Sequence, residues 1–384
     1  MREGWTYKKL GDICEIITKG TTPTTLGYNF IDDGINFIKI ECIGTNRNLI
    51  KDKLNYISEE CNKSMSRSQL QEKDLLFSIA GALGRIYIVE KSVLPANTNQ
   101  ALSIIRLRDK QDLFLQYLSI FLNSNTIKRQ IEKDKVGVAQ LNLSLSQVRN
   151  FIIPIPPLAE QERIVAELDL LSGIIEKKKE QLKAYDQLAQ SIFYTMFGDP
   201  IDNPKGWEVK KLKEVSTLIN GRAYKQNELL SEGKYKVLRV GNFFTNSNFY
   251  YSDLELEDNK YCDNGDLLFA WSASFGAFIW NGGKVIFHYH IWKVLYDEQQ
   301  LNKIFYRFLL NTMTNAFMND VHGIGMVHLT KQGMEEYNIP IPPLSLQQEF
   351  AEKVEAIERQ KALVQQSIEE TQTMFDCTMD KYFG

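Results

Sequence analysis

Two long stretches of the chain carry apolar side chains at alternating steps of four and three positions. These seam positions are Ile164, Leu168, Leu171, Ile175, Leu182, Tyr185 and Ile192 in the first stretch and Phe350, Val354, Ile357, Val364, Ile368 and Phe375 in the second. A narrow apolar seam sustained over about four heptads predicts a coiled coil, and the alternative is an ordinary amphipathic helix packed on a domain. Each seam also contains one lysine, Lys178 or Lys361, and such a polar residue often sets the register.

Both stretches follow the same motif, Ile-Pro-Ile-Pro-Pro-Leu, at residues 153–158 and 339–344. The offset of 186 positions then holds to the C-terminus, where Phe383-Gly384 repeats Phe197-Gly198. Proline fixes φ and keeps the preceding residue extended, so the motif predicts a stiff exit from a globular domain into a helix. The chain is therefore predicted to be two half-molecules in tandem. If the seams meet, the helices run antiparallel, the second returns to the first domain, and a pseudo-two-fold axis relates the halves.

The remainder of each half predicts an α+β domain, because short runs rich in β-branched residues alternate with apolar-periodic helical segments. Both halves begin with Gly-Trp (Gly4, Gly206) and contain Asp-Leu-Leu-Phe, starting at Asp74 and Asp266. The expected strands are 35–40, 86–89, 101–107, 236–240, 277–280 and 291–295, and the expected helical segments are 113–130 and 301–317. The predicted organisation is a globular domain at 1–155, a helix and linker at 156–200, a second domain at 201–341 and a second helix at 342–384.

Composition and charge narrow the class of protein. The 384 residues carry a formal net charge of −3, but the globular parts are neutral to basic and the helices are acidic. This asymmetry permits a nucleic-acid partner without demanding one. No apolar run reaches the length of a membrane span, so no membrane association is expected. The 5 cysteines form no Cys-x-x-Cys pair, which indicates a reducing, cytoplasmic location rather than a disulfide framework.

Enzyme motifs are missing from the sequence. It contains no P-loop, no His-Glu-x-x-His and no Gly-x-Ser-x-Gly, so we expect no catalytic residues on this chain. His288 and His290 are predicted to share one face of a strand. With His322 or His328 they suggest a metal site, but no carboxylate or cysteine stands at ligand spacing, so polar contact or packing is the expected role and no metal is predicted.

The loops of both halves contain the side chains that a DNA reader uses, because Arg, Lys, Asn, Gln, Ser and Thr reach base edges and phosphates. The candidate DNA-binding residues are Lys19, Thr21, Thr22, Lys39, Ser78, Arg85, Asn97, Asn99, Gln100, Gln140 and Asn142 in the first half and Arg222, Tyr224, Lys225, Arg239, Trp271, Ser272, Ser274, His288, His290 and His328 in the second. For any single residue, a plain surface or turn role is an equal alternative. The set as a whole favours DNA contact.

These features together resemble the specificity subunit of type I restriction–modification enzymes. The resemblance rests on the two Gly-Trp domains, the repeated proline motif and the helix opening Ala-Glu-Gln-Glu-Arg-Ile at residues 159–164, and it covers the whole chain. The second copy departs from this opening, reading Ser-Leu-Gln-Gln-Glu at residues 345–349. The resemblance implies two target-recognition domains in tandem, each followed by a long helix, with the two helices forming an antiparallel coiled coil.

The same resemblance implies a non-catalytic subunit that reads a bipartite, asymmetric sequence in double-stranded DNA. Each domain would read one half-site, and the helix pair would set the spacer between them. The implied partners are two methyltransferase subunits and restriction/translocase subunits. S-adenosylmethionine, ATP and magnesium would belong to those partners, with no cofactor on this chain. A protein–protein adaptor, an orphan DNA-binding protein without active partners and an enzyme with an unrecognised site are the alternatives, and the missing motifs disfavour the last.

Overall fold

The computed structural model describes residues 2–44, 46–108, 111–133, 142–245, 247–272, 274–319 and 330–384. The chain divides into two compact units, each of which contains part of both long helices. Unit 1 comprises Met1–Lys178 and Ser367–Gly384, and unit 2 comprises Lys179–Gln366. Each unit is described by itself below. Among the described residues, no helix combines the length and apolar character that crossing a membrane requires.

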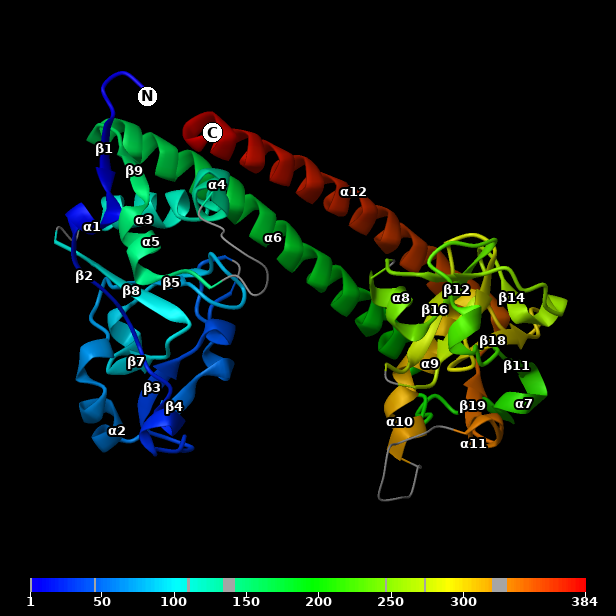
Figure 1. Ribbon diagram of the computed structural model, residues 1–384. Helices are drawn as coiled ribbons and strands as arrows, with labels where there is room; N and C mark the ends of the chain where they lie inside the picture. Colours follow the sequence, from blue (N-terminus) through cyan, green and yellow to red (C-terminus); the bar gives the residue numbers. More distant parts are fainter. Residues whose placement is uncertain are drawn as a thin grey trace. The chain divides into compact units, whose positions relative to one another are not determined.

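Unit 1 is built around a four-stranded antiparallel sheet and a smaller three-stranded sheet (Figure 1). The larger sheet has the order β2 (Cys14–Lys19), β8 (Leu102–Leu107), β5 (Leu75–Ser78), β6 (Ile86–Ile88). The smaller has the order β4 (Asn55–Ile57), β3 (Ile35–Ile38), β7 (Ala96–Thr98). In the smaller sheet β3 pairs with β4 antiparallel and with β7 parallel. The parallel pair matters for the candidate site, because both strands end at the same edge.

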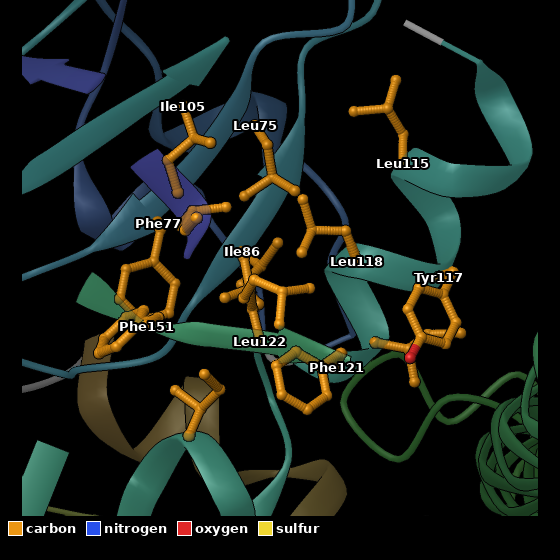
Figure 2. Close-up of a cluster of buried hydrophobic side chains, with 14 of the residues drawn as sticks. Leu75, Phe77, Ile86, Ile105, Leu115, Tyr117, Leu118, Phe121, Leu122 and Phe151 are labelled. Atoms are coloured by element: carbon orange, nitrogen blue, oxygen red, sulfur yellow. The ribbon is translucent and has the colours of Figure 1, made fainter. Parts of the chain in front are cut away.

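The larger sheet shares a core with the helices α1 (Leu10–Ile13), α3 (Asp112–Phe121), α4 (Asn125–Lys133) and α5 (Leu145–Asn150). The helix α2 (Glu59–Ser64) packs against the smaller sheet instead, where Cys61 shares a core with Phe37 of β3 and Ile57 of β4. Figure 2 shows the core that results, with Leu75, Phe77 and Ile86 of the sheet next to Leu118 and Phe121 of α3, all of them buried. This burial of apolar area is the main stabilising contribution to the unit.

Unit 2 repeats this plan, with one additional strand, β14 (Tyr261–Cys262), in its smaller sheet. Its larger sheet has the order β11 (Ser216–Asn220), β18 (Ile291–Tyr296), β15 (Leu267–Ala270), β16 (Gly276–Ile279). Its smaller sheet has the order β13 (Tyr250–Ser252), β12 (Tyr235–Leu238), β17 (Val285–Phe287), β14 (Tyr261–Cys262), with β12 and β17 parallel. Its helices are α7 (Leu212–Val215), α8 (Val240–Thr245), α9 (Lys303–Thr312), α10 (Thr314–Asn319) and α11 (Lys331–Glu335). The predicted α+β fold and tandem repeat are confirmed.

The proline motif is extended, as expected, and in each unit it pairs with the strand that follows Gly-Trp. The antiparallel pairs are β1 (Thr6–Lys9) with β9 (Ile152–Ile155), and β10 (Glu208–Lys211) with β19 (Asn338–Ile341). A buried glutamine then fixes the turn into each long helix: Gln161 donates to the Pro156 carbonyl (2.9 Å) and Gln347 to the Pro342 carbonyl (2.8 Å). The glutamine is therefore the part of the helix opening that both copies keep.

The long helices α6 (Leu158–Phe197) and α12 (Leu344–Phe383) pack against each other inside both units. In unit 1, Ile164 and Leu168 from the start of α6 share a core with Tyr382 from the end of α12. In unit 2, Phe193 from the end of α6 shares a core with Val354 from the start of α12. In both cores the start of one long helix packs against the end of the other, so α6 and α12 run antiparallel. The end of α12 therefore lies in unit 1, which also contains the start of the chain.

The seam positions lie on the inner faces of these helices. All thirteen predicted apolar seam residues are buried or half-buried, whereas Leu170 and Leu363, which are off the seam, are 65% and 59% exposed. The two seam lysines find partners on the other helix. Lys178 donates to Thr371 Oγ1 (3.3 Å) and to Ser367, and Lys361 pairs with Asp186 (2.7 Å).

The last phenylalanine of each long helix enters an aromatic cluster. Phe383 packs edge-on against Phe121 of α3, with ring centroids 5.3 Å apart, and Phe197 packs against Phe305 of α9 at 4.7 Å. These phenylalanines are the residues that the 186-position repeat aligns, so the repeat encodes equivalent anchors in the two units.

Some sequence-based expectations were wrong in detail. The helical segment expected at 113–130 is interrupted between α3 and α4, and the segment at 301–317 between α9 and α10. The expected strand face carrying His288 and His290 does not exist, because β17 ends at Phe287 and these histidines lie in the turn before β18. The turn nevertheless brings their rings within 4.8 Å of each other.

Candidate nucleic-acid interface

The candidate interface of each unit is the edge at which the two parallel strands of the smaller sheet end. In unit 1, Ile38 of β3 is in register with Thr98 of β7, so Lys39 and Asn99 leave the sheet side by side. The end of β2 joins them, because the Gly20 backbone N–H donates to the Asn99 carbonyl (3.2 Å). In an α+β domain, loops that a rigid sheet positions in this way are common binding sites. The edge therefore gathers candidates from three separate segments.

A glycine makes this close approach possible in both units. A Cβ on Gly20 would lie 1.7 Å from the Thr98 carbonyl oxygen, and a Cβ on Gly221 would lie 2.4 Å from the His288 carbonyl oxygen. Neither glycine has a positive φ, so the requirement is the absence of a side chain rather than an unusual backbone conformation. Both edges therefore depend on a glycine where the chain passes the ends of the parallel strands.

We expect Gly20→Ala and Gly221→Ala to separate these crossing segments and to destabilise their own units by about 1 to 3 kcal/mol each, because the clash is with backbone. Gly173→Ala is the matched control. Gly173 lies in α6 with open space around its Cβ position, so this change should stabilise by up to about 1 kcal/mol. Hydrogen exchange followed by mass spectrometry measures each unit separately. Equal effects from all three variants would contradict the close-packing argument.

At the edge of unit 1, several candidate residues are accessible and ordered by local bonds. Thr22 donates to the Gln100 side chain (2.6 Å), and Asn99 accepts from the backbone N–H of Ala101 (3.1 Å). Lys39 forms an ion pair with Glu41 (2.9 Å). Partial burial is the largest single influence on Glu41 and acts against its ionisation. The hydrogen bond and charge of Lys39, a backbone hydrogen bond and the charge of Lys53 together outweigh burial and lower the pKa of that carboxyl. The charge of Lys39 is thus neutralised within the domain.

Three candidates of unit 1 have structural roles instead. Ser78 and Asn97 are fully buried. Ser78 donates to the Ala82 carbonyl (2.7 Å) and closes the β5–β6 hairpin, and Asn97 donates to Asn62 Oδ1 (2.8 Å). Arg85 is held by the Ile43 carbonyl (2.8 Å). We remove Ser78 and Asn97 from the candidate set, because neither offers an accessible polar atom.

The remaining candidates of unit 1 are placed around this edge or outside it. Lys19 is exposed at the end of β2, Thr21 is half-buried beside it, and Asn142 is exposed before α5. Gln140 lies outside the described residues.

At the equivalent edge of unit 2, a cavity of about 480 Å³ gathers candidates that the sequence places far apart. Leu238 of β12 is in register with Phe287 of β17, so Arg239 and His288 emerge together. The cavity is lined by Arg239, Val240, Gly241, Asn242, Thr245, Ser247, Asn248, Ser272, His288 and His290. Asn242, Ser247 and Asn248 were not singled out from the sequence, since only the tertiary fold brings the α8 region over the strand ends.

A second cavity of about 420 Å³ shares His290 and includes Trp271 and Tyr289. The Trp271 indole N–H donates to the Tyr289 carbonyl (2.8 Å), and its ring stacks on Trp292 at 5.6 Å between centroids. Ser274 is half-buried in the same β15–β16 loop. Aromatic faces beside polar groups suit contact with nucleobases or sugars.

Arg222 and its neighbours are more strongly tied to the protein. Arg222 forms a forked ion pair with Glu228 (2.8 and 2.9 Å), and the Arg222 hydrogen bond lowers the pKa of Glu228 to about 2. Tyr224 is half-buried near His288, and burial raises the pKa of its hydroxyl. Lys225 is exposed. Of these, Lys225 is the cation most available to a phosphate.

His288 is a neutral hydrogen-bonding group at neutral pH. Burial, with smaller effects from His290 and Arg239, lowers the pKa of His288 from 6.5 to about 4. Its Nδ1 accepts from the backbone N–H of His290 (3.4 Å), which favours the tautomer with the proton on Nε2. No cluster of His, Cys, Asp or Glu suited to a metal occurs within the described ranges. His322 and His328 lie outside those ranges.

The type I restriction modification DNA specificity domain is the family whose model matches this chain, over residues 2–184 and 204–372. The chain belongs to this family. The two matched segments correspond to the two halves, so each of the candidate edges described above lies in its own DNA specificity domain.

Two relatives of this DNA specificity domain protein match it along most of their length and its own. It is 24% identical to the putative type I restriction enzyme MjaX specificity subunit of Methanocaldococcus jannaschii over 93% of this chain and 87% of that protein. It is 25% identical to the type I restriction enzyme MjaVIII specificity subunit of the same organism, over 93% and 86%.

Solved structures share the fold. A chain from a study of complex assembly and conformational transition of the type I R-M system matches with a TM-score of 0.60 and 20% identity, covering 100% of this chain and 98% of that one. The type I restriction–modification S subunit from M. genitalium matches with a TM-score of 0.51 and 13% identity, covering 99% and 96%.

Proposed function

We propose that this chain, a non-catalytic specificity subunit, directs a type I restriction–modification complex to a bipartite, asymmetric DNA sequence, with each unit reading one half-site. The observation that supports this is the duplicated edge. Gly20 and Gly221 allow a similar close backbone approach in the two units, whereas the side chains at the edge differ, with Lys39 in one unit where the other has Arg239. A shared frame with different donors and acceptors suits two readers of different sequences.

The helix pair then sets the number of unread base pairs between the half-sites. This role is supported by the packing of α6 and α12 within both units and by the buried seam. The seam lysines support a single register, because Lys178 and Lys361 each bond to a polar group on the opposite helix.

Catalysis belongs to partner subunits in this proposal. Two methyltransferase subunits dock on the subunit, one for each half of the repeat, and restriction/translocase subunits join them. The partners carry S-adenosylmethionine, ATP and magnesium. The near-neutral charge of this chain fits such an assembly, since the partners can supply many of the phosphate contacts that dominate DNA affinity.

Exchange of one domain tests this assignment. Residues 1–150 are replaced by the corresponding domain of another family member, and adenine methylation is mapped across the genome of cells that carry the complete complex. We expect one half-site to change and the other to remain, because each unit has its own core and its own edge. A change in both half-sites would contradict independent reading. If deleting the gene alters no methylation, the adaptor and orphan alternatives take its place.

A further inference from the structure

The two units differ in charge at one equivalent position of the candidate edge. Lys39 follows β3 and Arg239 follows β12, and the same turn begins at both. The Lys39 backbone N–H donates to Cys42 Sγ (3.4 Å), and the Arg239 backbone N–H donates to Asn242 Oδ1 (2.8 Å). The two cations therefore occupy the same place in the repeated fold.

Their surroundings are not the same. Lys39 is paired with Glu41, two positions later, at 2.9 Å. The residue two positions after Arg239 is Gly241, and within the described ranges Arg239 forms no ion pair. Unit 2 therefore presents an un-neutralised cation where unit 1 presents a neutral pair.

Arg239 is also held in a defined orientation. Its guanidinium lies over the Tyr250 ring, 4.3 Å from the centroid, and its buried Nε has no hydrogen-bond partner among the described residues. Stacking on an aromatic ring costs a planar guanidinium little and leaves its N–H groups free for a ligand. A buried donor without a partner is unfavourable in the free protein and becomes favourable when a ligand supplies an acceptor.

The cavity in front of Arg239 has the character of a base-edge site. Its lining includes Asn248, Ser247 and Ser272 and two histidines, and no carboxylate. Such a lining fits a partner rich in hydrogen-bond acceptors. In the major groove, guanine presents two adjacent acceptors, O6 and N7, and arginine contacts both at once.

We propose that Arg239 reads a guanine in the half-site recognised by unit 2, with its forked N–H groups on O6 and N7, and that the Lys39–Glu41 pair denies unit 1 the same contact. This inference rests on the proposed function and goes beyond it by naming the base and the residue. A contact to a phosphate instead of a base is the competing outcome. The two differ because a phosphate contact carries no sequence information.

The first experiment replaces Arg239 and maps the methylated motif of the complete complex. We expect Arg239→Ala to accept any base at one guanine position of one half-site, with discrimination at that position falling about 5- to 150-fold. Arg239→Lys should also relax it, since an ammonium cannot make the forked contact. Lys234→Gln is the matched control, because Lys234 precedes the same strand at its other end, and it should leave the motif unchanged. A uniform loss of methylation with an unchanged motif overturns the proposal in favour of a phosphate contact.

The second experiment recreates the unit 1 arrangement in unit 2 and does not depend on removing the arginine. A Cβ at Gly241 meets no atom within 4 Å, so a longer side chain is accommodated. We expect Gly241→Glu to neutralise Arg239 and relax the same guanine position, whereas the uncharged Gly241→Gln should retain it. If both variants keep the guanine, the proposal is overturned.

The motif of the wild-type complex distinguishes failure of the Arg239 contact from failure of the proposed function. A wild-type complex that methylates a bipartite motif without a guanine in the half-site assigned to unit 2 overturns the Arg239 proposal alone. A wild-type complex with no bipartite motif overturns the proposed function itself.

Discussion

A heptad inserted into both long helices is expected to move methylation to a motif with the same two half-sites and a spacer longer by about three base pairs. The insertion points are between Lys178 and Lys179 in α6 and between Gln366 and Ser367 in α12, which is where the chain divides into its two units. The contacts within each unit, including the Lys178–Thr371 hydrogen bond and the Lys361–Asp186 ion pair, then stay as they are.

The expected change in spacer length follows from the geometry of the α-helix and of DNA. Seven residues lengthen a helix by about 10.5 Å at roughly 1.5 Å per residue. DNA advances by about 3.4 Å per base pair, which gives about three base pairs. Those base pairs also rotate the second half-site by roughly a third of a turn, since B-DNA repeats about every 10 base pairs. The helices or the DNA must absorb this twist, so we expect slower methylation at the new motif.

Genome-wide mapping of methylated adenine in cells that carry the variant complex measures the outcome. Inserting the heptad into α6 alone is the control, because the seam of α12 then has no matching partner and no new motif should arise. An altered half-site with an unchanged spacer would show that the helices do not set the spacing.

Removal of the Asp74 carboxylate is expected to destabilise unit 1 by about 3 to 5 kcal/mol, the usual cost of leaving a buried charge without its partner. Asp74 is fully buried and receives two hydrogen bonds from Arg106, each 2.7 Å long. The Asp74 hydrogen bond raises the pKa of Arg106. The guanidinium stays charged when that carboxylate is lost, because arginine is not deprotonated in proteins. Asp74→Ala therefore strands a cation of which only 8% is exposed.

The repeat supplies a matched control in Asp266→Ala. Asp266 starts the same Asp-Leu-Leu-Phe motif and accepts the backbone N–H of Asp263 (2.8 Å), as Asp74 accepts that of Gln71 (2.8 Å). Its ion pair with Lys293 is more exposed, with 26% and 20% of the two side chains accessible. We expect a loss of about 1 to 2 kcal/mol in unit 2, mostly from the turn hydrogen bond.

Hydrogen exchange in β5 and in β15 reports the two units separately in one protein. Losses of equal size from Asp74→Ala and Asp266→Ala would mean that burial of the ion pair does not decide its contribution. In that case the turn hydrogen bond that Asp74 and Asp266 both accept would explain why an aspartate precedes β5 and β15.

The sequence by itself determined the features that depend on local periodicity. The seam residues from Ile164 to Phe375 follow from their heptad spacing, and the extended proline motif follows from restricted φ. The tandem repeat follows from the constant offset that aligns Phe197 with Phe383. The two-unit α+β plan and the antiparallel direction of the helices came from the same information.

Tertiary structure alone decided how the loop residues are grouped. The parallel pairing of β3 with β7 and of β12 with β17 joins segments that are about 50 to 60 positions apart, and no local pattern predicts it. That pairing brings Arg239 to His288, whereas burial withdraws Asn97 and Ser78 from the surface. The state of each cation also depends on its neighbours: Glu41 neutralises Lys39, and Tyr250 orients Arg239 without neutralising it. Accessibility and charge depend on contacts between distant segments, and those contacts exist only once the chain has folded.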